Sequence, residues 1–260
     1  DLPLNEPEVW TAAEAARWSE EHRGKYLVGD DRVIGVVAGG EARAYPLRVL
    51  NWHEIANDTL GGRPIAVTYN PLTDAAVVFD RHLDGAPVRF GHSGLLYNSN
   101  LLLYDRRPRP EASTLWSQLL AEGVAGPRAG HPLKVLPASV CRWDGWQRIH
   151  PETTVVAPDP RWVKKYKRAP YTSYFGSDQL RFPVEPLPSD DRPRKIRILA
   201  LRHGGVTTVV DFERLARAGE KRVDRTVGGV TVSLQLSGEP PGYLLEPTPT
   251  QAASPPPVET

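Results

Sequence analysis

The sequence predicts an α+β fold: a β-rich mixed fold with two pseudo-repeated units of strands around one helix, plus further short helices. Short runs of Val, Ile, Leu, Tyr and Phe are separated by Gly, Pro, Asn or Asp, as expected for strands joined by turns. The order strand, Gly-Gly, strand, helix, strand also occurs twice, at about residues 33–70 and 196–236. Two copies are too few for a solenoid, so a pseudo-symmetric α+β fold is favoured.

Local signals mark the first elements. Thr11 precedes Glu14 by three residues, which is the spacing of a capping box and predicts the start of a helix. Residues 33–45 place two strand-like runs around Gly39-Gly40. This pattern predicts a β-hairpin with a two-residue turn.

Further elements follow along the chain. A helix is predicted over 46–56, because Pro46 suits a first helical position and apolar residues recur at helical spacing. We then expect strands over 65–69, 75–80, 88–91, 101–106 and 134–136, and helices over 114–122, 143–150 and 211–218. Seven prolines between Ala157 and Pro193 predict a long irregular crossing segment over the core, residues 157–193.

One domain is expected over residues 1–245, followed by a Pro-rich disordered tail over 246–260. The tail has five prolines in fifteen residues and too little apolar surface to offset the entropy of ordering. The chain starts at Asp1 and contains no Met, which favours a processed extracytoplasmic protein, secreted or tethered. Codon bias and a trimmed fragment are the alternatives, so a cytoplasmic location stays open.

The composition excludes several classes of protein. A net charge of +1, from 32 Lys+Arg and 31 Asp+Glu, argues against nucleic-acid binding through a broad basic field. No run of about 18 apolar residues occurs, so no membrane-spanning helix is expected. Cys141 is the only cysteine, which rules out an intramolecular disulfide and multi-cysteine zinc or iron–sulfur sites. Nucleotide-phosphate and zinc-protease motifs do not occur, and neither a nucleotide nor a haem is expected.

Two stretches of the chain carry a family resemblance. They are N-W-H-E-I from Asn51 to Ile55, and F-G-H-S-G-L-L-Y-N-S-N from Phe90 to Asn100, the latter followed by L-W-S-Q from Leu115 to Gln118. The sequence resembles the bacterial family named domain of unknown function 3179, and the similarity extends to about Gly238. The resemblance implies no established reaction.

One segment departs from the family pattern. Members of the family usually resemble Y-C-P-L-C-G-S where residues 69–75 of this chain read Y-N-P-L-T-D-A, so Asn70 and Thr73 replace both cysteines. Thiolates at this spacing bind soft metals or form a redox pair, whereas an amide and a hydroxyl do neither. We therefore expect any thiol chemistry of the family to be lost or replaced here, since Cys141 alone cannot restore the pair.

His53 is the leading candidate for a catalytic residue. A histidine acts as a base near neutral pH or as a metal ligand, and the alternative is a structural histidine. Its neighbour Glu54 is expected to be a solvated helix residue. Amides, hydroxyls and aromatic rings suit a polar ligand, and the residues expected to bind it are Asn51, Trp52, Asn70, Thr73, Ser93, Tyr97, Asn98, Trp116 and Gln118. Such groups also connect loops in β-rich proteins, which is the alternative interpretation.

A divalent metal ion is a further hypothesis. His53, His92 and Asp74 offer two nitrogens and one oxygen, a suitable ligand set. The alternative for His92 is a variable surface residue. Ser93 is not expected to be a nucleophile, because Gly91-His92-Ser93-Gly94 lacks the G-x-S-x-G spacing of a hydrolase. The basic run at 162–168 indicates either contact with an anionic partner or a solvated loop.

Three functions remain open at this point. The first is a small polar ligand-binding or interaction module with a pocket around His53 and residues 70–74. The second is an enzyme, either metal-dependent or using His53 for general acid–base catalysis. The third is a passive structural domain at a surface. The missing thiols favour the first function, while the ligand, the reaction and the oligomeric state stay open.

Overall fold

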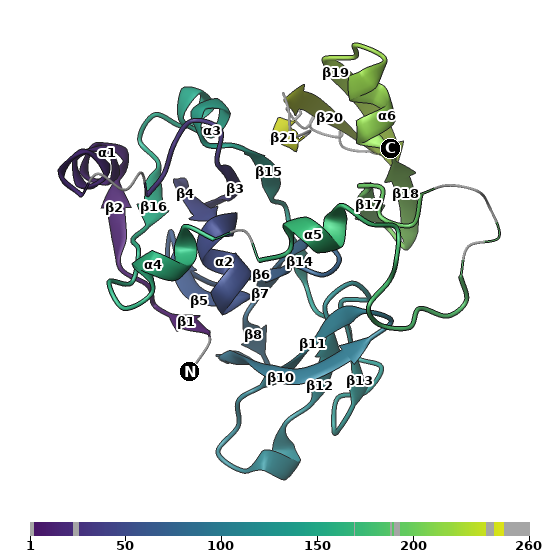
Figure 1. Cartoon of the computed structure of the whole chain (residues 1–260). Coiled ribbons are helices and arrows are strands. Elements are labelled where there is room, and N and C mark those ends of the chain that lie inside the picture. The colour runs from purple at the N-terminus through teal and green to yellow at the C-terminus, as the bar shows by residue number, and fades with distance from the viewer. Residues whose placement is uncertain are drawn as a thin grey trace, which may run out of the picture. The chain divides into compact units, whose positions relative to one another are not determined.

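The computed structural model has the β-rich α+β fold that the sequence predicts (Figure 1). It describes residues 3–22, 26–168, 170–187, 189, 193–237 and 242–246. The chain forms two compact units, Asp1–Arg197 and Ile198–Thr260. The single domain expected over 1–245 thus contains two units, and almost all of the expected tail at 246–260 lies outside the described residues.

A five-stranded sheet lies at the centre of the first unit. Its strand order is β1 (Leu4–Asn5), β5 (Ile55–Leu60), β6 (Arg63–Asn70), β7 (Ala75–Asp80) and β14 (Val135–Leu136). β1 runs parallel to β5, and the other neighbours are antiparallel. A short hairpin, β8 (His82–Leu83) and β9 (Ala86–Pro87), follows β7.

A four-stranded sheet packs against one face of the central sheet. Its order is β10 (Phe90–Tyr97), β11 (Asn100–Asp105), β12 (Leu115–Ser117) and β13 (Glu122–Ala125). The buried core between the two sheets includes Ile55, Ala66 and Phe79 from the central sheet and Phe90, Leu101, Leu103 and Trp116 from the other. Each fully buried large apolar side chain contributes about 1.5–3 kcal/mol to the free energy of unfolding.

The remaining strands of the first unit form a third sheet. Its order is β15 (Ser139–Arg142), β3 (Arg32–Ala38), β4 (Glu41–Pro46), β16 (Thr154–Val156) and β2 (Val9–Thr11). Cys141 pairs with Val33 across β15 and β3 and is buried, which raises the pKa of its thiol to about 12. The predicted capping box is present, because Thr11 and Glu14 bond reciprocally at the start of α1 (Ala12–Glu21). The predicted helix near residue 143 is α3 (Trp143–Ile149).

The helix that follows the first hairpin is shorter than predicted. α2 spans Leu47–His53, with Pro46 at the N-cap rather than at the first helical position. Glu54 adopts a left-handed backbone conformation (φ 56°), and Ile55 already pairs in β5. The helix expected up to residue 56 therefore ends at His53, because strand pairing begins directly after one left-handed residue.

The prediction of a helix over residues 114–122 is wrong. These residues contain strand β12, whose Ser117 pairs with Leu102 of β11, and Trp116 between the sheets is fully buried. Burial and strand pairing outweigh the local helical pattern here. The crossing segment is less irregular than expected, since it contains α4 (Val163–Tyr166) and α5 (Thr172–Phe175). A 3-10 turn spans Pro110–Ala112.

The second unit repeats the element order of residues 32–70 in the first. β17 (Leu199–His203), β18 (Val206–Val210), α6 (Phe212–Arg217), β19 (Arg222–Val227) and β20 (Val230–Ser237) correspond in order to β3, β4, α2, β5 and β6. β21 (Gly242–Glu246) then pairs with β20. Gly-Gly turns join the strands of each hairpin in both units, all with positive φ. That the two stretches are copies of one unit stays a prediction. None of the described helices is long and apolar enough to cross a membrane.

Candidate functional site

A chain of polar side chains links the two packed sheets at one end of their interface. Gln118, just after β12, donates to the Thr68 hydroxyl in β6 at 2.9 Å. Asn100 in β11 donates to Gln118 Oε1 at 2.8 Å and to the Thr73 hydroxyl at 3.1 Å. Two predicted ligand-binding residues, Thr73 and Gln118, thus belong to one network, and their bonds connect the sheets.

Asn70 lies beside this network with an unused donor. It is two residues after Thr68 in β6, so the two side chains share one face of the strand. Its Oδ1 accepts a hydrogen bond from the Leu72 N–H at 2.8 Å. Its Nδ2 is buried without an acceptor among the described residues. A buried donor left in this way costs about 1–3 kcal/mol, so this amide is suited to an acceptor from a ligand.

Asp74 is surrounded by cationic partners. Arg32 bonds both of its oxygens at 3.0 Å, Arg197 forms an ion pair with it, and the Tyr69 hydroxyl donates to it at 2.6 Å. Burial raises the pKa of Asp74, but the two arginines and Tyr69 outweigh burial and hold it below its ordinary value. Asp74 is therefore a structural anion.

His53 is buried at the end of α2, with only 2% of its surface exposed. Its Nε2 lies 2.7 Å from the Tyr166 hydroxyl, and its ring centroid lies 5.0 Å from that of Trp162. Burial raises the pKa of Tyr166, which keeps the phenol neutral. Both aromatic residues belong to the crossing segment, and Figure 1 shows α4 beside α2. This geometry supports the structural alternative for His53, which anchors the crossing segment on α2.

A pair of tryptophans extends this contact. Asn51 and Trp52 are half-buried on α2, and the Trp52 ring lies 6.4 Å from the Trp162 ring. The Lys165 ammonium lies 3.9 Å from the Trp162 centroid and 5.7 Å from the Trp52 centroid. The indole faces attract this cation, so the contact further fixes α4 on α2.

The partly exposed ionisable pair beside His53 consists of Glu54 and His92. His92 Nε2 lies 2.8 Å from Glu54 Oε2, and about a fifth of each side chain is exposed (21% and 22%). The Gly94 N–H donates to His92 Nδ1 at 3.0 Å, so Nε2 carries the hydrogen shared with Glu54. The hydrogen bond to Glu54 raises the pKa of His92, although partial burial opposes the shift. The pair therefore joins a carboxylate to a partly exposed histidine whose protonated form it favours.

Irregular backbone holds both members of this pair. Glu54 is left-handed, a conformation that costs about 1–2 kcal/mol for a residue other than glycine. A β-bulge interrupts β10 between His92 and Leu96. Ser93 fixes the bulge, because its hydroxyl donates to the Leu102 carbonyl at 2.5 Å and accepts from the Leu95 N–H at 3.1 Å. Such irregularities frequently lie beside functional sites.

The turn after β10 has an anchoring role. Asn98 and Ser99 both have positive φ, as a two-residue hairpin turn requires. Asn98 exchanges two hydrogen bonds with the Glu185 backbone, and Ser99 donates to the Phe182 carbonyl at 2.9 Å. These contacts connect the hairpin to the crossing segment. Neighbouring Tyr97 is half exposed.

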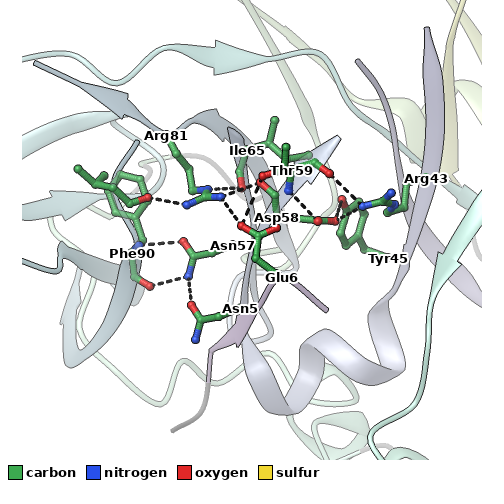
Figure 2. Close-up of polar contacts among 11 residues, drawn as sticks. Asn5, Glu6, Arg43, Tyr45, Asn57, Asp58, Thr59, Ile65, Arg81 and Phe90 are labelled. Carbon is green, nitrogen blue, oxygen red and sulfur yellow. Dashed lines mark hydrogen bonds and ion pairs between the residues drawn. The ribbon is translucent and has the colours of Figure 1, made fainter. Parts of the chain in front are cut away.

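A second polar cluster, missed at the sequence level, lies in the first unit, and its members are buried apart from Asn5, Glu6 and Thr59 (Figure 2). Asp58 accepts from Arg43 at 2.7 Å and from the Tyr45 hydroxyl at 2.6 Å. Asn57 exchanges two hydrogen bonds with the Phe90 backbone, at 2.8 and 2.9 Å. Figure 2 shows that Arg81 joins the cluster, where it donates to Glu6, Ile65, Val88 and the Asp58 carbonyl. The cluster connects three sheets, and the sequence signal for it was the polar pair within β5.

The structure does not bring the three hypothetical metal ligands together. His53 bonds Tyr166, His92 bonds Glu54, and Asp74 bonds two arginines. Across the described ranges, no group of three or more His, Cys, Asp or Glu residues is placed to hold a metal ion. Trp116, another predicted ligand-binding residue, is buried in the core and donates from Nε1 to Asp105 at 3.1 Å.

Sequence reasoning also missed the partners of His53 and His92. Glu54 was expected to be solvated, and Tyr166 and Tyr171 were expected only as aromatic anchors of the crossing segment. Burial raises the pKa of Tyr171, the charge of Glu54 raises it further, and the charge of Arg181 lowers it. The charges of Glu54 and Arg181 therefore both act on the Tyr171 hydroxyl. No local signal indicated these partners, since Glu54 and His92 are 38 positions apart.

Comparisons with known proteins give one match. No curated protein and no solved structure matches the chain. A family model described as a protein of unknown function, DUF3179, matches residues 3–241. This range includes the Glu54–His92 pair and extends through most of the second unit. The chain therefore belongs to the DUF3179 family, as its motifs predicted.

Proposed function

We propose that this domain binds a small polar ligand at the end of the interface between the five-stranded and four-stranded sheets. The Glu54–His92 pair and the Asn70 amide are the groups assigned to the ligand. The observation that carries the proposal is this partly exposed pair, held by a left-handed residue on one side and a β-bulge on the other. Maintaining two irregular backbone elements costs stability, which a purely structural hydrogen bond does not require.

The chemistry of these groups defines the ligand. A carboxylate accepts hydrogen bonds, so Glu54 suits a hydroxyl or amine of the ligand. The Asn70 Nδ2 group suits a carbonyl or carboxylate oxygen. A compact molecule with both donors and acceptors satisfies these groups together.

Heteronuclear NMR on the full chain tests this proposal. We would titrate a panel of sugars, polyols, amino acids and dicarboxylates and follow the amide signals of Glu54, Asn70, His92 and Gly94. A ligand of this site is expected to shift these signals and to bind at least about tenfold more weakly to the His92→Gln variant.

A matched control is available in the same unit. His82 forms a hydrogen bond of the same length with Asp80, 2.8 Å, but its side chain is 47% exposed and is not among the groups assigned to the ligand. His82→Gln should leave binding unchanged. If every ligand bound both variants equally well, or if no panel member shifted the named signals, the structural alternative would be favoured instead.

General acid–base catalysis is the second candidate function. A carboxylate that bonds one nitrogen of a histidine orients the ring and favours its protonated form, as the raised pKa of His92 indicates. In this case His92 replaces buried His53 as the catalytic candidate. Slow chemical conversion of a panel ligand by the wild type, lost in His92→Gln while binding persists, would support an enzyme.

A further inference from the structure

Two cationic side chains meet on one aromatic ring of the crossing segment. Tyr174, in α5, is buried with 4% of its surface exposed. The Lys195 ammonium lies 3.6 Å from its ring centroid, and the Arg181 guanidinium carbon lies 5.1 Å from it. Lys195 also donates to the Tyr174 and Ser177 carbonyls at 2.5 and 2.6 Å, so the cation is held in a defined position.

Among the described residues, no anion accompanies these two cations as it does other cation pairs in the first unit. Asp74 lies between Arg32 and Arg197, and Asp84 between Arg107 and Arg128. Arg181 and Lys195, by contrast, have no carboxylate within 4.0 Å among the described residues. Loss of solvent and the charge of Arg181 lower the pKa of Lys195, and Asp178 offsets this only in part. The two cations are therefore close enough to repel each other.

Tyr171 connects this place with the Glu54–His92 pair. It precedes Tyr174 by three residues at the start of α5, and both Glu54 and Arg181 act electrostatically on its hydroxyl. Tyr171 thus lies within electrostatic reach of Glu54 on the proposed ligand site and of Arg181 at the cation pair. A small molecule can contact both if it carries an anionic group at one end.

We propose that Arg181 and Lys195 bind the anionic group, a phosphate or a carboxylate, of the small ligand whose polar end contacts the Glu54–His92 pair. This inference rests on the proposed function and adds the charge of the ligand to it. A guanidinium presents a planar fork that bonds two oxygens of an anion, and an ammonium adds a point charge. The Tyr174 ring supports both side chains by cation–π contact.

The charge of the crossing segment agrees with an anionic ligand. Five exposed cations stand between residues 161 and 168, namely Arg161, Lys164, Lys165, Lys167 and Arg168, and no acidic residue occurs from 160 to 177. The whole chain carries only +1, so this positive field is local. Such a field raises the local concentration of small anions.

The test measures binding of two simple anions to the full chain. Inorganic phosphate and succinate are titrated at constant ionic strength, and the Arg181 side-chain NεH signal and the Tyr174 amide are followed by NMR. We expect saturable shifts in the wild type, at least about tenfold weaker binding in Arg181→Gln, and partial recovery in Arg181→Lys. Arg161→Gln is the matched control, because Arg161 is an exposed arginine of the same segment paired with Asp159.

The outcomes separate this inference from the proposed function. Equal binding by wild type and Arg181→Gln, or no saturable shift with either anion, overturns the anion site. Binding of panel ligands that depends on His92 but not on Arg181 also overturns it, while the proposed function stands. If anion binding depends on Arg181 but His92→Gln changes the binding of no ligand, the anion site stands and the proposed function is overturned. Arg181-dependent binding to phosphatidylglycerol vesicles without binding of either free anion would overturn the assignment to a small ligand.

Discussion

Residues 32–70 and 199–237 have the same order of elements, yet their helices end in different ways. In the second stretch α6 ends before Gly219 (φ 81°), and several residues separate it from β19. In the first stretch a single left-handed residue, Glu54, connects α2 to β5. Glycine adopts this conformation without strain, and glutamate does not. In the first stretch a glutamate thus occupies a position whose backbone conformation is strained for any residue other than glycine. Its side chain bonds His92.

The two stretches also differ in the burial of their third strand. Asn57 and Asp58 of β5 are buried between sheets, whereas Asp224 and Arg225, at the corresponding places in β19, are not buried. The same local order therefore carries a polar core in the first unit and a more exposed strand in the second. Variants at matched positions can test each difference.

The largest expected effect comes from the buried polar cluster. Asp58→Ala leaves Arg43 and Tyr45 without their shared acceptor, and should lower the free energy of unfolding by about 3–5 kcal/mol. Urea titration followed by tryptophan fluorescence measures this, since all seven tryptophans lie in the first unit. Arg225→Ala, the matched change, should alter stability by less than about 0.5 kcal/mol, as followed by circular dichroism. A loss below about 1 kcal/mol for Asp58→Ala would contradict the structural role of the cluster.

An intermediate effect is expected at the glycine turns. A Cβ atom on Gly39 would lie 2.1 Å from the Gly61 carbonyl oxygen, because the two turns of the first stretch pack together. At Gly204 the nearest atom would be 3.8 Å away, although φ is nearly the same. Gly39→Ala should therefore cost about 1–3 kcal/mol more than Gly204→Ala. Equal losses of stability would mean that backbone strain, and not packing of the turns, explains these glycines.

The smallest effect concerns the Glu54–His92 pair and depends on pH. The folded pKa of His92 is above its ordinary value, so the contribution of the pair is fully present below about pH 6.5 and disappears as pH rises through the folded pKa. Glu54→Gln should remove this dependence. The free energy of unfolding of the wild type should exceed that of Glu54→Gln by up to about 1 kcal/mol at pH 6 and by less at pH 9.

NMR titration of the His92 ring gives the direct measurement. In Glu54→Gln the pKa of His92 should fall toward its ordinary value. An unchanged pKa of His92 in this variant would show that Glu54 does not interact with it in solution.

Features set by neighbours in the chain could be predicted. The capping box at Thr11, the hairpin around Gly39-Gly40 and strand β7, which matches the predicted bounds, all depend on local backbone and side-chain preferences. The helix predicted over 114–122 was wrong, because burial of Trp116 between two sheets is a tertiary effect.

For the candidate site, the sequence could predict an approximate location in the chain but not the role of each residue. The motif around His53 and the segment at Asn70 lie near the end of the interface where we propose that a ligand binds. The bonds that decide the role of each residue join distant parts of the chain, 113 positions apart for His53 and Tyr166. Whether a histidine is buried or accessible depends on such contacts. For this reason the sequence favoured His53, while the geometry favours His92.

The buried Cys141 can serve as a natural probe of local opening. Its thiol is 1% exposed, and a pKa of about 12 leaves almost no reactive thiolate at neutral pH. With no other cysteine in the chain, alkylation reports on Cys141 alone, and it requires a fluctuation that exposes this buried thiol. The labelling rate therefore measures how often the structure around Cys141 opens, and mass spectrometry can record it without any engineered probe.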